Sequence, residues 1–172
     1  VGYAQVIINI IFIILLLSFH GAQTRFYYEA KEKPDVFGSY LFSTNVFLYV
    51  IAFAYVIVVF FFGKDFFQCF NSNIPYKPYI EIALYIPVLM VFNHLSVSLS
   101  LAEKKYKKNV ILNILLFLFT TGFIILFIVG CNFDAYGYLL GTLLGHFLFF
   151  FVTYWFYAGN FIFRFSFSHI RY

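Results

Sequence analysis

Polar side chains recur at helical spacing within three otherwise apolar segments of this chain. Residues three, four or seven apart share one face of a helix, so each set forms a stripe. The sets are Gln5, Asn9, His20 and Gln23; Asn93, Ser96, Ser100 and Glu103; and Asn109, Asn113 and Thr120. Inside a membrane such groups face protein or water, because exposure to lipid is costly. The stripes indicate either a polar cavity or hydrogen bonds that join helices, and both explanations stay open.

Another segment combines a packing motif with a second polar face. Gly137, Gly141 and Gly145 form GxxxGxxxG, a spacing that lets two helix backbones come close. The opposite face carries Thr142, His146 and Thr153. If the glycines meet a neighbouring helix, this second face meets the interior, where His146 could carry a proton or bind substrate. A hydrogen-bonded, structural histidine is the simpler explanation, and it is the one we favour.

The candidate substrate-binding residues are the amides and His146 together with one arginine. Arg25 follows the first apolar segment, where a guanidinium can hold a phosphate through two parallel hydrogen bonds. A role as a topology anchor is compatible with this one. Pro87 lies in the middle of its segment and predicts a kink, because proline removes a helical hydrogen bond. The full candidate set is Arg25, Gln5, Asn9, Gln23, Asn93, Asn113 and His146.

Several kinds of site are not expected. No charged residue falls near the middle of an apolar segment, which weighs against a cation antiporter built on a buried carboxylate and against an intramembrane hydrolase. Cys69 and Cys131 are isolated, and no CxxC or Cys/His spacing indicates zinc. The two cysteines could pair in an oxidising compartment, but we expect unpaired thiols. We therefore predict no metal, no cofactor and no covalent catalysis.

The elements that must position these residues are five long apolar segments. Each has about the ~20 residues that a helix needs to cross a hydrocarbon layer of ~30 Å. Hydrophobic residues make up 63% of the chain and charged residues only 10%, which a water-soluble globule would not show. We predict an all-α membrane bundle in a single transmembrane domain over residues 1–172, with spans at 3–21, 36–63, 79–102, 109–130 and 135–158.

Basic residues alternate between the gaps of this pattern and predict its orientation. Positively charged loops stay in the cytoplasm, so the first and third gaps and the tail should face inward. The N-terminus then starts outside and the C-terminus ends in the cytoplasm. The basic third gap also suits anionic headgroups, and we explain the net charge of +4 by topology and not by nucleic-acid binding. The nine residues are Arg25, Lys31, Lys33, Lys104, Lys105, Lys107, Lys108, Arg164 and Arg171.

The stretch GAQTRFYYE, preceded by a segment that opens VGYAQ, resembles the polysaccharide-export flippases. These are Wzx-type members of the multidrug/oligosaccharidyl-lipid/polysaccharide exporter superfamily, which commonly show an Arg-aromatic-Tyr-x-Glu motif after their second helix. The later stretches AEKKYKKN and AYGYLLGTLLG are similar to the family's fourth-to-fifth loop and sixth helix. The resemblance covers nearly the whole chain, although each motif is loose. It implies that the five spans are helices two to six.

The resemblance implies a fold and a function. The complete protein would be a MATE-like bundle of about twelve to fourteen helices with alternating access. It would carry a polyprenyl-diphosphate-linked oligosaccharide across a bacterial inner membrane for surface polysaccharide such as O-antigen or capsule. Arg25 matches the family's arginine. The implied partners are this substrate, membrane lipids and a polysaccharide polymerase complex. On this basis, and because the chain starts outside without Met, we expect a fragment that lacks the first helix and the C-terminal lobe.

Two other functions remain open at this point. A MATE-type drug or cation exporter would need a carboxylate embedded in the membrane. A membrane glycan polymerase or acyltransferase would need clustered arginine or histidine in a large outer loop, whereas the outer gaps here are short. A non-catalytic membrane subunit is a further possibility. The sequence indicates neither the glycan nor the coupling ion nor the oligomeric state.

Overall fold

The fold is a bundle of helices, described here from a computed structural model for residues 2–17, 19–30, 32–70 and 76–158. Lys31, Arg164 and Arg171, which contribute to the predicted charge pattern, lie outside the described residues. The elements in chain order are α1 (Gly2–Leu16), α2 (Phe19–Ala30), α3 (Pro34–Phe70), η1 (Tyr76–Ile80), α4 (Glu81–Ala102), α5 (Tyr106–Ile125), η2 (Leu126–Gly130) and α6 (Asp134–Ala158).

Five helical stretches of the described chain are long and apolar enough to cross a membrane. They cover Gly2–Ala30, Asp35–Asp65, Tyr76–Ala102, Tyr106–Gly130 and Asp134–Phe156. The all-α, multi-span character expected from composition is therefore present. Local sequence explains where several helices begin. Pro34 occupies the first turn of α3, where its missing N–H costs nothing, and Asp35, Glu81 and Asp134 place negative charge near helix N-termini.

The first span differs from a single straight helix followed by a loop. α1 ends at Leu16, and Leu17 adopts a positive φ of 45°, a conformation that costs a non-glycine residue about 1–2 kcal/mol. The chain then continues as α2 through the stretch GAQTRFYYE, much of which we had assigned to a loop. This stretch is helical because it packs on α4: Gln23 and Ala30 are buried there or against α3. Tertiary packing thus overrides a polar composition.

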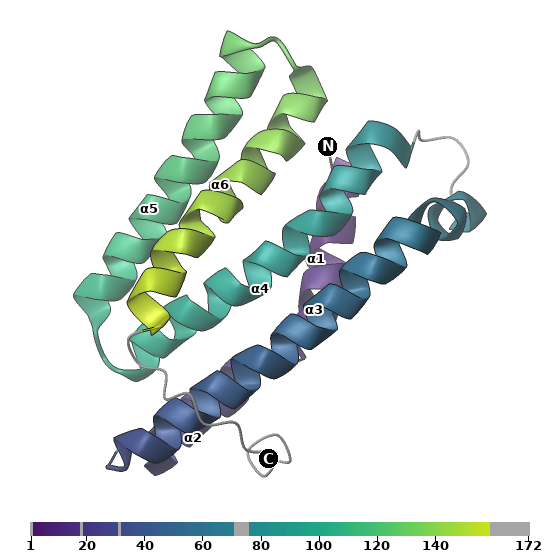
Figure 1. The fold of residues 1–172 in the computed structure, drawn as a ribbon. Coiled ribbons are helices and arrows are strands. Elements are labelled where there is room, and N and C mark those ends of the chain that lie inside the picture. Colours follow the sequence, from purple (N-terminus) through teal and green to yellow (C-terminus); the bar gives the residue numbers. More distant parts are fainter. Residues whose placement is uncertain (1, 18, 31, 71–75, 159–172) are drawn as a thin grey trace.

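Helix α4 is the centre of the bundle. It packs against α1, α2, α3, α5 and α6, and Figure 1 shows it crossing between the α5–α6 pair and the α1–α3 side. Half of its apolar window is buried, against 6% for α5. One apolar cluster joins three helices through Leu15 and Leu16 of α1, Leu48 of α3 and Val91 of α4. Helices α1, α2 and α6 therefore pack extensively on α4, whereas α5 contacts it less.

Helices α5 and α6 form a close antiparallel hairpin, visible as the two green to yellow helices in Figure 1. The glycines of α6 lie against the backbone of α5. A Cβ built on Gly141 would lie 2.6 Å from the Ile124 nitrogen, and one on Gly145 would lie 2.5 Å from the Thr120 Cα. A Cβ on Gly137 would lie 3.1 Å from the Phe127 carbonyl carbon. The GxxxGxxxG face is thus the surface on which the two helices meet.

The turns divide between the two ends of the bundle. The α2–α3 and α4–α5 turns lie at one end, and the α5–α6 turn and the start of α4 lie at the other (Figure 1). The first and third gaps, both basic and both predicted to face the same side of a membrane, therefore share one end of the molecule.

We predict that Gly141→Ala lowers the free energy of unfolding by about 1–3 kcal/mol, the usual cost of overpacking a fitted interface. The added methyl group would meet the α5 backbone, which cannot rotate away as a side chain would. Unfolding in mixed micelles of increasing dodecyl sulfate content, followed by far-UV circular dichroism, measures the change.

Gly122→Ala in α5 is the matched control, because a Cβ there meets nothing within 4 Å. This substitution should leave stability unchanged or raise it by up to about 1 kcal/mol through helix propensity. Equal effects of the two substitutions would show that the Gly141 contact does not limit the hairpin.

Candidate functional site

The most completely bonded polar group inside the bundle joins α4 to α6. Asn93 donates through Nδ2 to His146 Nδ1 at 3.2 Å and to the His146 carbonyl oxygen at 3.1 Å. Thr153 Oγ1 lies 3.2 Å from Asn93 Oδ1, and the carbonyl oxygens of Phe149 and Phe150 on its own helix are acceptors for the same proton at 3.1 and 3.0 Å. All three side chains are buried. We call Asn93, His146 and Thr153 the α4–α6 polar cluster.

The bonding of this cluster defines the state of His146. An amide nitrogen only donates, so Nδ1 of His146 accepts, and the ring is neutral with its proton on Nε2. The contact to the His146 carbonyl requires a donor and therefore indicates the same orientation of the Asn93 amide, with Nδ2 toward His146. This arrangement matches the structural role considered for His146, because the ring nitrogen already has a partner from a neighbouring helix.

A second polar group joins α1 to α6 near the opposite end of the bundle from the α4–α5 turn. Tyr138 donates through its hydroxyl to Gln5 Oε1 at 3.1 Å, and Gln5 Nε2 donates to Asn9 Oδ1 at 3.2 Å. Gln5 and Tyr138 are half-buried, whereas Asn9 is exposed. Sequence reasoning did not include Tyr138, although it lies four residues before Thr142 on the same helix face. We call Gln5, Asn9 and Tyr138 the α1–α6 amide group.

A third set surrounds the start of α2. Gln23 is buried and donates to the Leu95 carbonyl oxygen of α4 at 3.3 Å. Beside it, the rings of His20 and His94 meet edge to face with centroids 5.3 Å apart, and His94 makes a similar contact with Phe12 at 5.6 Å. The bond from Gln23 gives a backbone carbonyl of α4 a second donor and holds α2 on that helix.

The remaining candidates lie near the end that carries the α4–α5 turn. Asn113 is exposed and donates to the side chain and the carbonyl of Asn109 at 3.0 and 2.9 Å. Arg25 pairs through Nε with Glu29 Oε1 at 2.9 Å, one helical turn away, and 83% of its side chain is exposed. Neither residue points into the packed interior.

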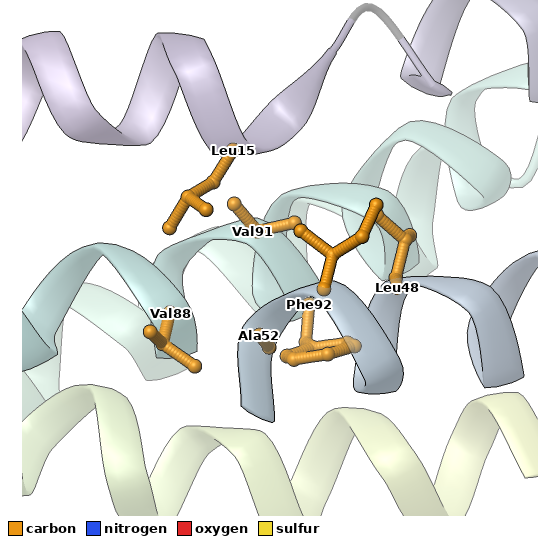
Figure 2. Close-up of a pocket in the computed structure, with 7 residues that line it drawn as sticks. Leu15, Leu48, Ala52, Val88, Val91 and Phe92 are labelled. Carbon is orange, nitrogen blue, oxygen red and sulfur yellow. The ribbon is translucent and has the colours of Figure 1, made fainter. Parts of the chain in front are cut away.

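The seven candidates therefore do not line one common cavity within the described residues. Asn93 meets His146, and Gln5 meets Asn9, whereas Gln23, Asn113 and Arg25 each bond elsewhere. A cavity between α1, α3 and α4 has a volume of about 10 Å³, enough for one water molecule at most (Figure 2). Its lining is apolar: Leu15, Leu48, Ile51, Ala52, Val88, Val91 and Phe92. The binding roles of the seven residues remain predictions.

Pro87 lies inside α4, which continues on both sides of it. Tyr55 of α3 donates through its hydroxyl to the Leu84 carbonyl oxygen at 3.0 Å, in the turn that precedes the proline. A proline weakens the helical bonding of this turn, and neighbouring helices commonly supply the missing donors. The bond ties α3 to α4, and sequence reasoning did not foresee it because Tyr55 sits in an unbroken apolar run.

Among the described residues, no group of three or more His, Cys, Asp or Glu side chains could hold a metal ion. Comparisons add no identity, since no family model, no curated protein and no solved structure matches this chain. Function must be argued from the residues themselves.

We predict that the α4–α6 polar cluster contributes a measurable coupling between its helices. A double-mutant cycle of Asn93→Leu and Thr153→Val should give a coupling energy of about 0.6 kcal/mol and at most about 1.7 kcal/mol, the range of interhelical hydrogen bonds in membranes. Unfolding in mixed micelles provides the four stabilities.

The control cycle combines Asn113→Leu with Thr153→Val. Asn113 is exposed and bonds within α5, so the two changes share no partner and should add within about 0.3–0.5 kcal/mol. If the effects of Asn93→Leu and Thr153→Val also add within about 0.3–0.5 kcal/mol, the cluster does not stabilise the pair of helices.

Proposed function

We propose that this chain belongs to a transporter that moves a polyprenyl-diphosphate-linked oligosaccharide from the inner to the outer leaflet of a bacterial inner membrane. The step is a translocation, with no bond made or broken. The proposal rests on the multi-span helical fold, on the resemblance of GAQTRFYYE to the polysaccharide-export flippases, and on the chemistry of the polar groups described above.

Arg25 is the observation that carries the proposal. Its ion pair with Glu29 occupies Nε, and the side chain is 83% exposed, so the terminal nitrogens stay open to a ligand. A guanidinium has five N–H donors in a planar fork that fits phosphate oxygens. Arg25 lies in the last turns of α2, close to the bundle end where a lipid headgroup would stand. A diphosphate is the lipid-borne group that best matches this position.

The α1–α6 amide group supplies a reason for a sugar as the second part of the substrate. Asn9 is exposed, and both amides can donate and accept, as sugar hydroxyls require. Uncharged polar groups of this kind on a helix surface are costly against lipid, so a polar occupant would stabilise them. Both features suit a ligand with a charged end and a neutral, hydroxyl-rich end.

Two alternative functions receive less support. Every carboxylate among the described residues lies near a helix end or in a turn, which disfavours an exporter with a membrane-embedded acid. The residues are Glu29, Glu32, Asp35, Asp65, Glu81, Glu103 and Asp134. The α5–α6 turn is short and holds neither arginine nor histidine, which disfavours a glycan polymerase or acyltransferase that acts there.

We predict that Arg25→Ala abolishes most of the transport that the wild-type protein supports. In a host from which the complete gene is deleted, the wild-type gene should restore surface polysaccharide and release lipid-linked oligosaccharide trapped on the inner leaflet. Loss of a charged hydrogen bond costs about 1.5–3 kcal/mol, so Arg25→Ala should reduce restoration roughly ten- to hundredfold. Quantified surface glycan and extracted lipid-linked oligosaccharide measure this reduction.

Glu29→Gln is the matched control, because it removes the same ion pair but keeps the guanidinium. It should restore polysaccharide to near the wild-type level, which separates ligand binding from helix stability. If the deletion leaves surface glycan intact but raises drug sensitivity, the flippase proposal is wrong and the exporter gains support.

A further prediction concerns orientation. Cys131 is exposed in the α5–α6 turn, which we place on the outer side. In a Cys69→Ser background, a membrane-impermeant maleimide should label Cys131 in intact spheroplasts. With Cys131 also replaced by serine, Lys107→Cys should be labelled only after the membrane is opened. If Lys107→Cys is labelled in intact spheroplasts and Cys131 only after the membrane is opened, the orientation is the reverse of the one proposed.

A further inference from the structure

The charges of the turns are unequal, and one turn stands apart. Around the α2–α3 turn, three basic residues are offset by Glu29, Glu32 and Asp35. At the opposite end, Lys64 adjoins Asp65, and Lys77 pairs with Glu81 at 3.7 Å. The α4–α5 turn and the first turn of α5 instead carry four lysines, Lys104, Lys105, Lys107 and Lys108, against a single carboxylate, Glu103. Its positive charge is therefore not balanced within its own surroundings.

The α4–α5 turn is also held in a defined shape. Lys104 has a positive φ of 56°, and its N–H bonds to the Leu101 carbonyl at 2.9 Å. The Lys105 N–H bonds to the Ser100 carbonyl at 3.0 Å. Asn109 Nδ2 lies 3.2 Å from both the Val97 carbonyl and Ser100 Oγ, and it donates to them across the turn. The lysines thus project from a turn whose backbone is bonded to both helices.

Each lysine of the turn has a different environment. Lys105 Nζ pairs with Glu103 Oε2 at 2.9 Å, so its charge is compensated. Lys104 and Lys107 are exposed, and neither forms an ion pair with a described residue. Lys108 is half-buried, with Nζ 5.4 Å from the centre of the Phe156 ring at the end of α6. Three cationic groups, on Lys104, Lys107 and Lys108, are therefore available at one end of a membrane-spanning bundle.

The neighbouring end of α6 is rich in exposed aromatic rings. Trp155 is 82% exposed, and Tyr154 and Phe156 are exposed as well. Aromatic residues at the end of a membrane helix rest at the level of lipid headgroups and upper acyl chains. Since Phe156 contacts Lys108, a surface that accepts an acyl chain adjoins a surface that accepts an anion.

We propose that Lys104, Lys107, Lys108 and the α6 residues Trp155 and Phe156 form a docking surface for an anionic phospholipid. The lysines would hold the headgroup phosphate, and the aromatic side chains would lie along the upper acyl chain. The turn between two apolar helices keeps its lysines close to the hydrocarbon boundary, so a lipid headgroup is the anion that stands opposite them. The proposal does not depend on the transport activity proposed above.

The chain contains its own probe for this surface, because Trp155 is its single tryptophan. The full chain is reconstituted into two kinds of phosphatidylcholine vesicle. One kind contains brominated phosphatidylglycerol, and the other contains brominated phosphatidylcholine. In both lipids the bromine is on the acyl chain near the glycerol. Bromine quenches tryptophan fluorescence only at short range. The attraction of each surface lysine for anionic lipid predicts a preference for phosphatidylglycerol of about fivefold or more over phosphatidylcholine at low salt. High salt should reduce this preference in the unchanged protein.

The test variant combines Lys104→Gln, Lys107→Gln and Lys108→Gln, and its preference should fall close to one. A control variant with Lys33→Gln, Lys64→Gln and Lys77→Gln removes the same number of charges elsewhere and should keep the wild-type preference. Circular dichroism and gel filtration confirm that both variants are folded.

Three outcomes would overturn the proposal. Equal quenching of the unchanged protein by the two brominated lipids would show that no anionic lipid prefers this surface. An equal loss of preference in both variants would assign the effect to net charge and not to the α4–α5 turn. Retained preference in the test variant with the salt effect intact would likewise place the anionic lipid on another surface.

Discussion

Inside a lipid bilayer, a polar group must find its hydrogen-bond partner within the protein, and this constraint shapes the bundle around α4. Gln23 of α2 donates to the Leu95 carbonyl, Tyr55 of α3 donates to the Leu84 carbonyl, and Asn109 of α5 donates to the Val97 carbonyl. Asn93 of α4 in turn donates to His146 of α6. Four helices thus use a hydrogen bond to hold the same central helix.

Close backbone contact complements this bonding where polar side chains are fewer. Helix α5 buries little of its surface, and it is held chiefly by the glycine face of α6. The same helix α6 uses its other face for the α4–α6 polar cluster and the α1–α6 amide group. Helix α6 therefore couples the exposed hairpin to the central helix, with small residues on one side and hydrogen-bonding residues on the other.

Much of the architecture could be predicted from the sequence, because five apolar runs separated by charged gaps leave little choice of element. The break at Leu17 could not, since no glycine or proline marks it and the packing of α2 on α4 decides it. The polar stripes indicated which residues need hydrogen-bond partners, but they did not indicate which residues those partners are. Asn93 finds His146 fifty-three residues away, whereas Asn113 bonds one turn back on its own helix. Such choices depend on how helices rotate, which spacing alone does not specify.

The break at Leu17 has a mechanical consequence for the first span. It divides the span into two helices that both pack on α4 but make different hydrogen bonds: α1 to α6 through Gln5 and Tyr138, and α2 to α4 through Gln23 and the Leu95 carbonyl. A continuous helix would hold the direction of the Arg25 segment to that of the Asn9 segment, whereas here the two residues lie on separate helices. The direction of α2, and with it the position of Arg25, is therefore set by the packing of α2 on α4 and not by the course of α1.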